Sequence, residues 1–371
     1  MELMNYLVPF LILLTVVVFI HEYGHYYFAK RYGVKVTDFS IGFGKEIFGW
    51  NDKSGTRWKI CLIPLGGYVK FFGDRNVFSQ SEQNDAYNKF SKEEKDQLFV
   101  FKPLYQRSLI VAAGPIANYV LAIFIFSFIY MFSGKDMTPA VINEVMIDSP
   151  AFVTGLKKND KILSINGRKV ESILEVSALI NTSMDEKIKI TIDRNRDELE
   201  FHIKPNLVLT KDSFGNEVEK KIIGIKLAPL NNEFKRNKLG PAKAVFYSLK
   251  EVIFVTTSSI EYLFAMIKGK SDSSQLGGPI RIAKITGQVS EHGLIPFLSI
   301  MAYISVSLGF INLFPIPMLD GGHLMFYAFE KILGRPLTQK TQEGFFRIGL
   351  FLLLSLMVFV TFNDLKDLGL F

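Results

Sequence analysis

Five consecutive residues, His21-Glu22-Tyr23-Gly24-His25, carry side chains that can bind a metal and move a proton. Residues four apart share one face of a helix, so the imidazoles of His21 and His25 converge as neutral donors to one ion. Zinc lowers the pKa of a coordinated water to about 7, and the Glu22 carboxylate, next to the first histidine, can take its proton. The pattern predicts metal-assisted hydrolysis with one Zn²⁺ per chain and Glu22 as the base. The alternative is two histidines hydrogen-bonded to backbone or lipid headgroups.

A catalytic zinc needs a third protein ligand and an open position. Residues 312–323 read NLFPIPMLDGGH and offer Asp320, with His323 as its substitute. The prolines break a helix, and broken helices at membrane depth line cavities. The stretch from Leu3 to His21 is about 27 Å long as a helix, which brings His21 to the membrane side that Asp320 also reaches. We therefore expect Asp320 to be the third ligand, the alternative being that it only caps a turn.

The elements that position these residues are long apolar runs. The chain has 371 residues, of which 49% are apolar and 21% charged, below the quarter or so that is usual in soluble domains. A spanning helix needs about 20 apolar residues, and four stretches qualify: 3–20, 108–134, 293–319 and 344–363. The first lacks the basic region and cleavage site of a signal peptide and is expected to be retained. The composition predicts a membrane protein with a soluble insert.

Positive charges predict the orientation of these spans. Lysine and arginine are frequent in residues 31–102 and in the link 331–340, so both are expected to face the cytoplasm. The two termini and the insert between the second and third spans would then lie outside the cytoplasm, with the metal-binding residues toward the cytoplasmic side of the membrane. One cysteine, Cys61, excludes a disulfide framework and a cysteine-based zinc ribbon. No basic tract with interleaved aromatics indicates nucleic acid.

The soluble insert has the pattern of a small, mostly β module. Alternating strands are expected at 141–145, 161–165, 187–193 and 198–203, with Asn166-Gly167 as a hairpin turn and a helix through Val176, Leu179 and Ile180. Residues 149–170, SPAFVTGLKKNDKILSINGRKV, resemble the core of a PDZ domain, which binds peptides by strand addition. The alternative is a β-sandwich fragment without a peptide groove. Residues 240–268 predict an amphipathic helix on the membrane or against the spans.

The predicted cytoplasmic loop contains a stretch, RWKICLIPLGGYV at 57–69, that is too apolar to be solvated. Its proline and glycine pair make it an edge strand or a bulge. We expect a β-hairpin that dips into the membrane cavity and pairs with substrate near residues 60–65. The expected substrate-binding residues are Ile60, Leu62, Pro64, Gly66 and Gly67. The alternative is an interfacial hairpin without a substrate role.

With these motifs in hand, the chain resembles the site-2 protease family of intramembrane zinc metalloproteases. HEYGH together with NLFPIPMLDGGH carries the resemblance. PLGGYVKF at 64–71, KPLYQRSLIVAAGPIAN at 102–118 and LGGPIRIAK at 276–284 resemble its regulator of sigma-E protease (RseP) branch. By matching positions, the resemblance implies zinc binding by His21, His25 and Asp320 and a catalytic base at Glu22. It also implies substrate contact by Asn312, whose alternative is a helix-end hydrogen bond beside Pro315. Asn118 matches a family motif, with packing and chemistry both open.

The resemblance also implies the substrates. They would be single-pass membrane proteins already shortened on the outer side, such as anti-sigma factors, and remnant signal peptides, cut by regulated intramembrane proteolysis. The best-known members carry two tandem PDZ domains, whereas this insert holds one, which would bind peptide or gate access. Two rival functions are a catalytically inactive membrane-anchored PDZ scaffold and a zinc transporter or sensor. The first predicts loss of a key residue and the second ligands spread through several spans.

The expected fold is a polytopic α-helical membrane protein with about four transmembrane helices, a membrane-associated β-hairpin region and one inserted extracytoplasmic PDZ-like α+β domain. The expected order is the first span with HExxH at 1–31, the cytoplasmic loop with the hairpin at 32–103, the second span at 104–134, the PDZ-like domain at 135–235, the amphipathic helix and GGPI segment at 236–292, the third span with NxxPxPxLDG at 293–330, a cytoplasmic link at 331–343, and the fourth span and C-terminus at 344–371.

Overall fold

The computed structural model describes residues 2–73, 90–183, 185–211, 217–229, 234–269 and 276–367. Residues 74–89 of the predicted cytoplasmic loop and residues 368–371 after the predicted fourth span lie outside the described residues. The chain divides into two compact units. Unit 1 comprises Met1–Ile125 and Gly278–Thr361, and unit 2 comprises Phe126–Gly277 and Phe362–Phe371.

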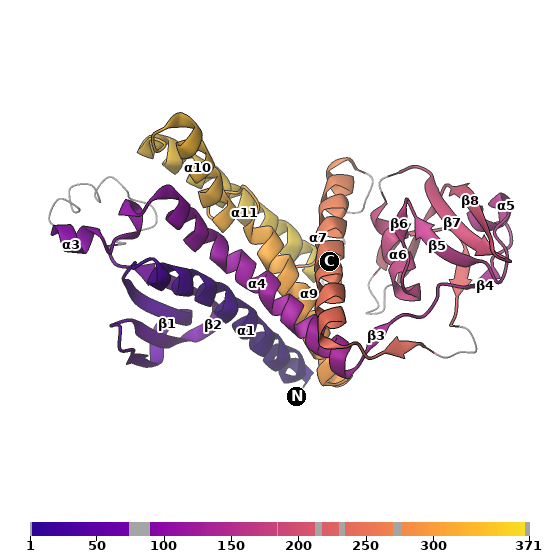
Figure 1. The fold of residues 1–371 in the computed structure, drawn as a ribbon, viewed down its shortest axis with the longest axis horizontal. Helices are drawn as coiled ribbons and strands as arrows, with labels where there is room; N and C mark the ends of the chain where they lie inside the picture. Colours follow the sequence, from indigo (N-terminus) through magenta and orange to yellow (C-terminus); the bar gives the residue numbers. More distant parts are fainter. Residues whose placement is uncertain are drawn as a thin grey trace. The chain divides into compact units, whose positions relative to one another are not determined.

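Four helices in the described part of the chain are long and apolar enough to cross a membrane, which confirms the predicted number of spans. Each holds a long apolar stretch with few charged residues, so burial of the helix in lipid leaves few charges unsolvated. They are α1 (Glu2–Arg31), α4 (Leu104–Phe132), α9 (Leu294–Asn312) and α11 (Gln339–Asp367), seen in Figure 1.

The third of these helices ends earlier than predicted. The sequence predicts an uncharged span to residue 319, but α9 ends at Asn312 and α10 (Asp320–Leu333) begins after a loop. The loop holds the two prolines, as the motif predicts, and Met318 has the left-handed φ of 91°. A β-carbon at Gly321 would overlap the carbonyl oxygens of Leu313 and Phe314. The glycine therefore lets the start of α10 fold back against the loop, which fixes Asp320.

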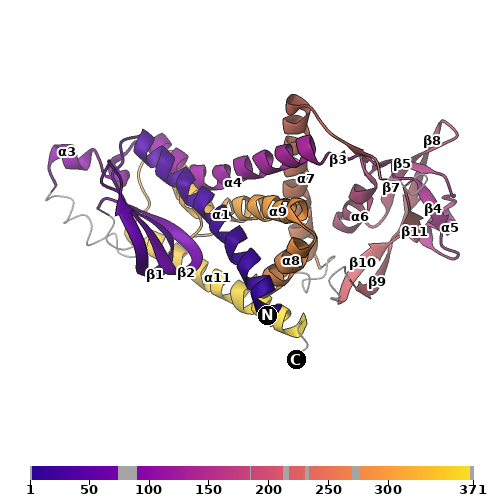
Figure 2. The same cartoon turned by 90° about the horizontal axis from the view of Figure 1, so that it is seen from below.

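Strands β1 (Val36–Asn51) and β2 (Arg57–Phe71) form a bent sheet beside α1 (Figure 2). Residues 36–41 pair with residues 71–67, and residues 38–41 also pair with 57–60. Residues 46–51 pair with 61–57. Ile60 accordingly has two partners, Ile41 and Phe48. Ile60 is therefore not at a sheet edge, because both neighbours come from the bent β1, a pairing that alternation along one strand does not reveal. The register shifts between β1 and β2 fit the bulge, which was the other possibility predicted for this stretch.

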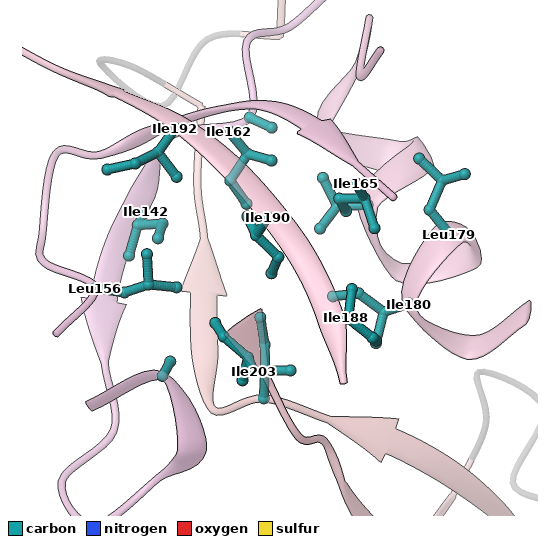
Figure 3. Packing of buried hydrophobic residues seen from close by; sticks show 14 residues of the cluster. Ile142, Leu156, Ile162, Ile165, Leu179, Ile180, Ile188, Ile190, Ile192 and Ile203 are labelled. Carbon is teal, nitrogen blue, oxygen red and sulfur yellow. The ribbon is translucent and has the colours of Figure 1, made fainter. Parts of the chain in front are cut away.

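Unit 2 contains the predicted mixed module. A four-stranded sheet has the order β6-β5-β7-β8, with β5 (Lys161–Ile165), β6 (Arg168–Lys169), β7 (Ile188–Arg194) and β8 (Asp197–Ile203). In β7 every second residue, Ile188, Ile190 and Ile192, is fully buried, as period-2 alternation requires (Figure 3). Helix α6 (Ile173–Thr182) covers this core with Leu179 and Ile180. These elements confirm the predicted strands, hairpin and helix.

The predicted strand at 141–145 is β4 (Ile142–Val145), which pairs with β11 (Ile225–Leu227) so that Ile225 faces Val145. Several other short elements of unit 2 were absent from the sequence prediction, among them β11 itself and a hairpin of β9 and β10 in which Asn206 faces Ile222. The bounds of the others are β3 (Lys135–Asp136), α5 (Pro150–Thr154), β9 (Asn206–Lys211), β10 (Glu217–Ile222) and β12 (Arg236–Asn237).

The predicted amphipathic helix is α7 (Pro241–Ile267). It packs against the end of α4 within unit 2, where the Ser127 hydroxyl donates to Ser248 Oγ at 3.1 Å and the Tyr130 hydroxyl donates to Glu251 at 3.2 Å. This contact fits the predicted packing against a span. The remaining described elements are α3 (Lys92–Lys95), the 3₁₀ turn Phe99–Phe101, and α8 (Pro279–Glu291), which runs along α1.

Candidate metal centre

Helix α1 presents the HEYGH turn to α4 at very short range. A β-carbon at Gly24 would lie 2.8 Å from the Ala113 carbonyl carbon and 2.9 Å from Ala117 Cβ, so only glycine permits this approach. Gly114 of α4 lies opposite the histidines, since a β-carbon there would overlap His25 Nε2 and lie 2.9 Å from His21 Nε2. Small residues on both helices thus seat the two imidazoles against the α4 backbone.

Three ligand atoms from α1 and α10 form a near-equilateral triangle. Asp320 Oδ2 lies 3.1 Å from His21 Nε2 and 3.5 Å from His25 Nε2, and the two Nε2 atoms are 3.3 Å apart. The three side chains are 10%, 13% and 18% exposed for His21, His25 and Asp320 respectively. Within the described residues, they are the group whose geometry could hold a metal ion.

The triangle has the size of one face of a zinc tetrahedron. Nitrogen and oxygen ligands about 2.0–2.1 Å from zinc, at tetrahedral angles, lie about 3.3 Å from one another. Despite its short contacts, Asp320 Oδ2 is buried with no hydrogen-bond partner among the described residues, so the contacts do not have hydrogen-bond geometry. Converging lone pairs on a buried, unsatisfied carboxylate oxygen are what a cation would neutralise. The donor set fits zinc.

The proton positions also fit. His25 Nδ1 lies 2.9 Å from the carbonyl oxygen of Ile110, an acceptor, so the ring proton sits on Nδ1 and leaves the Nε2 lone pair for a metal. His21 Nδ1 lies 3.2 Å from the Asn118 side-chain amide. The sequence left the role of Asn118 open, although its spacing of four residues from Gly114 puts both on the helix face that meets the histidines.

Glu22 lies between this cluster and the sheet. A β-carbon at Gly67 would lie 3.3 Å from Glu22 Cγ and 3.3 Å from Val18 Cγ1, so β2 crosses directly over this turn of α1. The backbone N–H of Val69 donates to the Glu22 carboxylate. The strand therefore holds the Glu22 carboxylate, while the Nε2 atoms of the two neighbouring imidazoles form the triangle with Asp320 Oδ2.

Other predicted site residues lie apart from the cluster. The His323 ring packs against Phe346 at 5.7 Å between centroids, so the substitute ligand faces aromatic rings and not the other histidines. Asn312 is the last residue of α9, half-buried, and its side chain makes no hydrogen bond with the described residues. Of the five predicted substrate-binding residues of β2, Gly67 lies next to Glu22; Ile60 and Leu62 are 41% and 63% exposed, and Pro64 and Gly66 are half-buried.

Comparisons with known proteins agree with this chemistry. The model of Peptidase family M50 matches residues 9–356. A protein of Agrobacterium fabrum named "Putative zinc metalloprotease" is 41% identical over 366 residues, which are 99% of this chain and 97% of that protein. A Rhizobium meliloti protein with the same name is 38% identical over 364 residues, 98% and 97% of the two chains. Metalloprotease MmpA of Caulobacter vibrioides is 36% identical over 386 residues, 98% and 96%. The chain belongs to peptidase family M50, the site-2 protease family, and is a zinc metalloprotease of the membrane.

Proposed function

We propose that this metalloprotease hydrolyses peptide bonds in or beside the transmembrane segment of single-pass membrane proteins that have already been shortened outside the cytoplasm. One observation carries the proposal: the triangle of ligand atoms uses two residues of Met4–Arg31, a helix apolar enough to cross a membrane. Ionisable side chains within a span are costly to bury and therefore usually functional. A site at this depth suits substrates that are themselves embedded in lipid.

In this proposal His21, His25 and Asp320 hold the zinc through the three atoms of the triangle. When bound, zinc polarises the scissile carbonyl and acidifies a water. Glu22 takes the proton of the attacking water and gives it to the leaving amine. Asn312 offers an amide to the substrate backbone or to the developing negative charge on the carbonyl oxygen, and the lack of a side-chain hydrogen bond to the described residues supports that role.

The substrate must be extended, because a helix shields its peptide bonds with its own hydrogen bonds. Within the stretch from Leu62 to Gly67, which leads toward Glu22, only Ile63 and Gly67 have a β1 partner. This supports the addition of a substrate strand along this stretch. Leu62 and Ile63 are 63% and 48% exposed. Large apolar side chains left on this sheet, including Phe48 and Trp50, further support contact with the membrane.

The insert in unit 2 is proposed to be an extracytoplasmic PDZ-like domain that binds peptide or gates access. Its support is the sheet capped by α6 and the Asn166-Gly167 turn, whose φ values of 48° and 77° suit a tight hairpin. The proposed orientation places both termini outside and the metal centre toward the cytoplasm of a bacterial inner membrane, supported by Lys331, Arg335 and Lys340 in and beside the link between α10 and α11. The process would be regulated intramembrane proteolysis.

The test is cleavage of a tagged single-pass membrane protein truncated on its outer side, with the native enzyme and Glu22→Gln compared in membranes. We expect the native enzyme alone to cut, while Glu22→Gln keeps its zinc, since Glu22 is not one of the three ligands. Cleavage by both would remove Glu22 from the mechanism. Cleavage by neither, of a substrate that a different intramembrane protease cuts, would favour a membrane scaffold. Zinc bound by variants of all three ligands would favour a site elsewhere, as in a transporter.

A further inference from the structure

The side chain of Asn118 occupies an unusual place in unit 1. It is fully buried in α4, and its Nδ2 lies 3.2 Å from His21 Nδ1. Its other amide atom, Oδ1, is buried and has no hydrogen-bond partner among the described residues. An unpaired buried carbonyl oxygen costs about 1–3 kcal/mol, so a fully buried asparagine in this state calls for a reason.

The position of the single ring proton of His21 supplies the reason. If His21 binds metal through Nε2, its single ring proton must sit on Nδ1. Nδ1 is then a donor, and the Asn118 NH₂ group facing it is also a donor, so the two cannot hydrogen-bond. A half turn of the amide exchanges Oδ1 for Nδ2 with almost no change in shape. Oδ1 then accepts the Nδ1 proton and is no longer unpaired, while the NH₂ group takes the position that Oδ1 held.

We propose that Asn118 is a positioning residue whose Oδ1 accepts a hydrogen bond from His21 Nδ1–H and so holds the Nε2 lone pair toward the metal. This inference rests on the proposed role of His21 as a ligand. Histidine ligands usually donate their second N–H to an acceptor that fixes the ring. His25 has such an acceptor in the Ile110 carbonyl oxygen, at 2.9 Å. Asn118 provides the matching acceptor for His21, and both acceptors belong to α4.

The backbone of Asn118 is itself braced from α9. The Ser305 hydroxyl, fully buried, donates to the Asn118 carbonyl oxygen at 2.8 Å. A β-carbon at Gly309 would lie 3.0 Å from the Pro115 carbonyl oxygen and 3.4 Å from Asn118 Cβ, so the two helices touch at this level. The amide therefore cannot withdraw from His21 without moving α4 against α9.

The two imidazoles differ in how their orientation can be changed by mutation. His25 is oriented by a main-chain carbonyl, which no substitution removes. His21 is oriented by a side chain, which substitution can replace by a group of similar size. Asn118→Leu removes the acceptor and keeps the branched shape of the side chain, with somewhat larger terminal groups, whereas Asn118→Asp keeps an oxygen acceptor in either rotamer. Comparing these two variants separates the effect of losing the hydrogen bond from the effect of changing the packing.

The experiment measures zinc affinity by chelator competition on the purified full-length protein in detergent, together with kcat and KM for a membrane substrate. We expect Asn118→Leu to weaken zinc binding about 10–100-fold, the usual cost of losing such a partner, and to lower kcat more than KM. Asn118→Asp should stay within a few-fold of the native affinity. Ser305→Ala, which loosens the same backbone without touching His21, should lower thermal stability and leave zinc affinity unchanged.

The outcomes separate the positioning role from the proposed site. Unchanged affinity in Asn118→Leu, or equal losses in Asn118→Leu and Asn118→Asp, would overturn the role of Oδ1. If Asn118→Leu does not fold, Asn118→Asp decides: retained affinity supports the oxygen acceptor and lost affinity rejects it. His21→Ala is the control for the ligand itself. Full zinc affinity in that variant would overturn the proposed site, whereas its loss together with a silent Asn118→Leu would overturn only the positioning role.

Discussion

Single missing side chains determine the geometry of the metal centre at the residue scale. Gly24 and Gly114 bring α1 and α4 together, and Gly321 lets α10 begin beside the loop that follows α9. Each would meet backbone or ligand atoms if it carried a β-carbon, and backbone atoms cannot move aside cheaply. The ligand types alone do not make the site. The missing side chains of these glycines let the helices approach closely enough to place the ligand atoms at zinc-binding distances.

Gly114→Ala is predicted to abolish high-affinity zinc binding, because its methyl group would overlap His25 Nε2. Zinc content of the purified variant, measured by elemental analysis after dialysis against a weak chelator, should fall well below one per chain. Gly344→Ala is the matched control, since a β-carbon there has no neighbour within 4 Å among the described residues and alanine favours a helix. A Gly114→Ala variant with full zinc would show that the ring can move away from α4.

At the element scale, the sheet is docked on α1 by one carboxylate in the turn between β1 and β2. Asp52 Oδ2 accepts from the Tyr26 hydroxyl at 2.8 Å and from Trp58 Nε1 at 3.1 Å, while Oδ1 accepts from Ser54 and from the Thr56 backbone. Tyr26 directly follows His25. The turn is therefore tied to the helix next to the metal ligands, and with it the strand that crosses Glu22.

Asp52→Asn is predicted to lower the free energy of unfolding by about 1–3 kcal/mol, because one acceptor oxygen becomes a donor facing donors. Cleavage should fall while zinc content is unchanged, since no metal ligand is altered. Thermal unfolding and zinc analysis check both, with the exposed Lys53→Ala as control. Equal behaviour of the two variants would mean that the carboxylate does not dock the sheet.

The charge of Asp52 adds a pH dependence to this docking. Burial alone would raise the pKa of Asp52, but the donors of Ser54, Thr56, Trp58 and Tyr26 outweigh it and hold that pKa well below its usual value. A depressed native pKa contributes stability above the unfolded pKa of about 3.9 and loses it as pH falls toward the native value. The native protein should therefore lose this docking only in strong acid.

Individual helices and strands also differ in how well the sequence predicts them. Local periodicity was enough for β7 and α6, since Ile188, Ile190 and Ile192 alternate and Val176 and Ile180 share a helix face. It could not reveal that residues 57–60 pair with two separate segments of β1, because that register depends on how a long strand bends. Ligand types and spacing predicted the triangle. The contact of Asn118 with His21 was missed because it depends on helix approach.

At the scale of the whole molecule, the proposed topology assigns the PDZ-like insert (135–235) and the link between α10 and α11 to opposite sides of the membrane. Lys158 and Arg335 are exposed residues of these two regions. The single native cysteine, Cys61, is buried and can be replaced by serine to give a cysteine-free background. One new cysteine at either position then reports its side of the membrane.

In that background, a membrane-impermeant maleimide added outside intact spheroplasts is predicted to label Lys158→Cys and not Arg335→Cys. Inverted vesicles should give the reverse pattern, because each thiol is accessible from one side only. Detergent-solubilised protein, in which both should react, is the control for reactivity. Labelling of both positions from the same side would reject the proposed topology.

The triangle joins residues 21 and 25 to residue 320, so its two halves are far apart in the order of synthesis. The ribosome makes the helix with Glu22 early, and that helix can enter the membrane long before Asp320 exists. If the three residues hold the zinc as proposed, a nascent chain, or a fragment that stops short of Asp320, carries two histidines without their third ligand. In that case the metal site is completed only when most of the chain has been made.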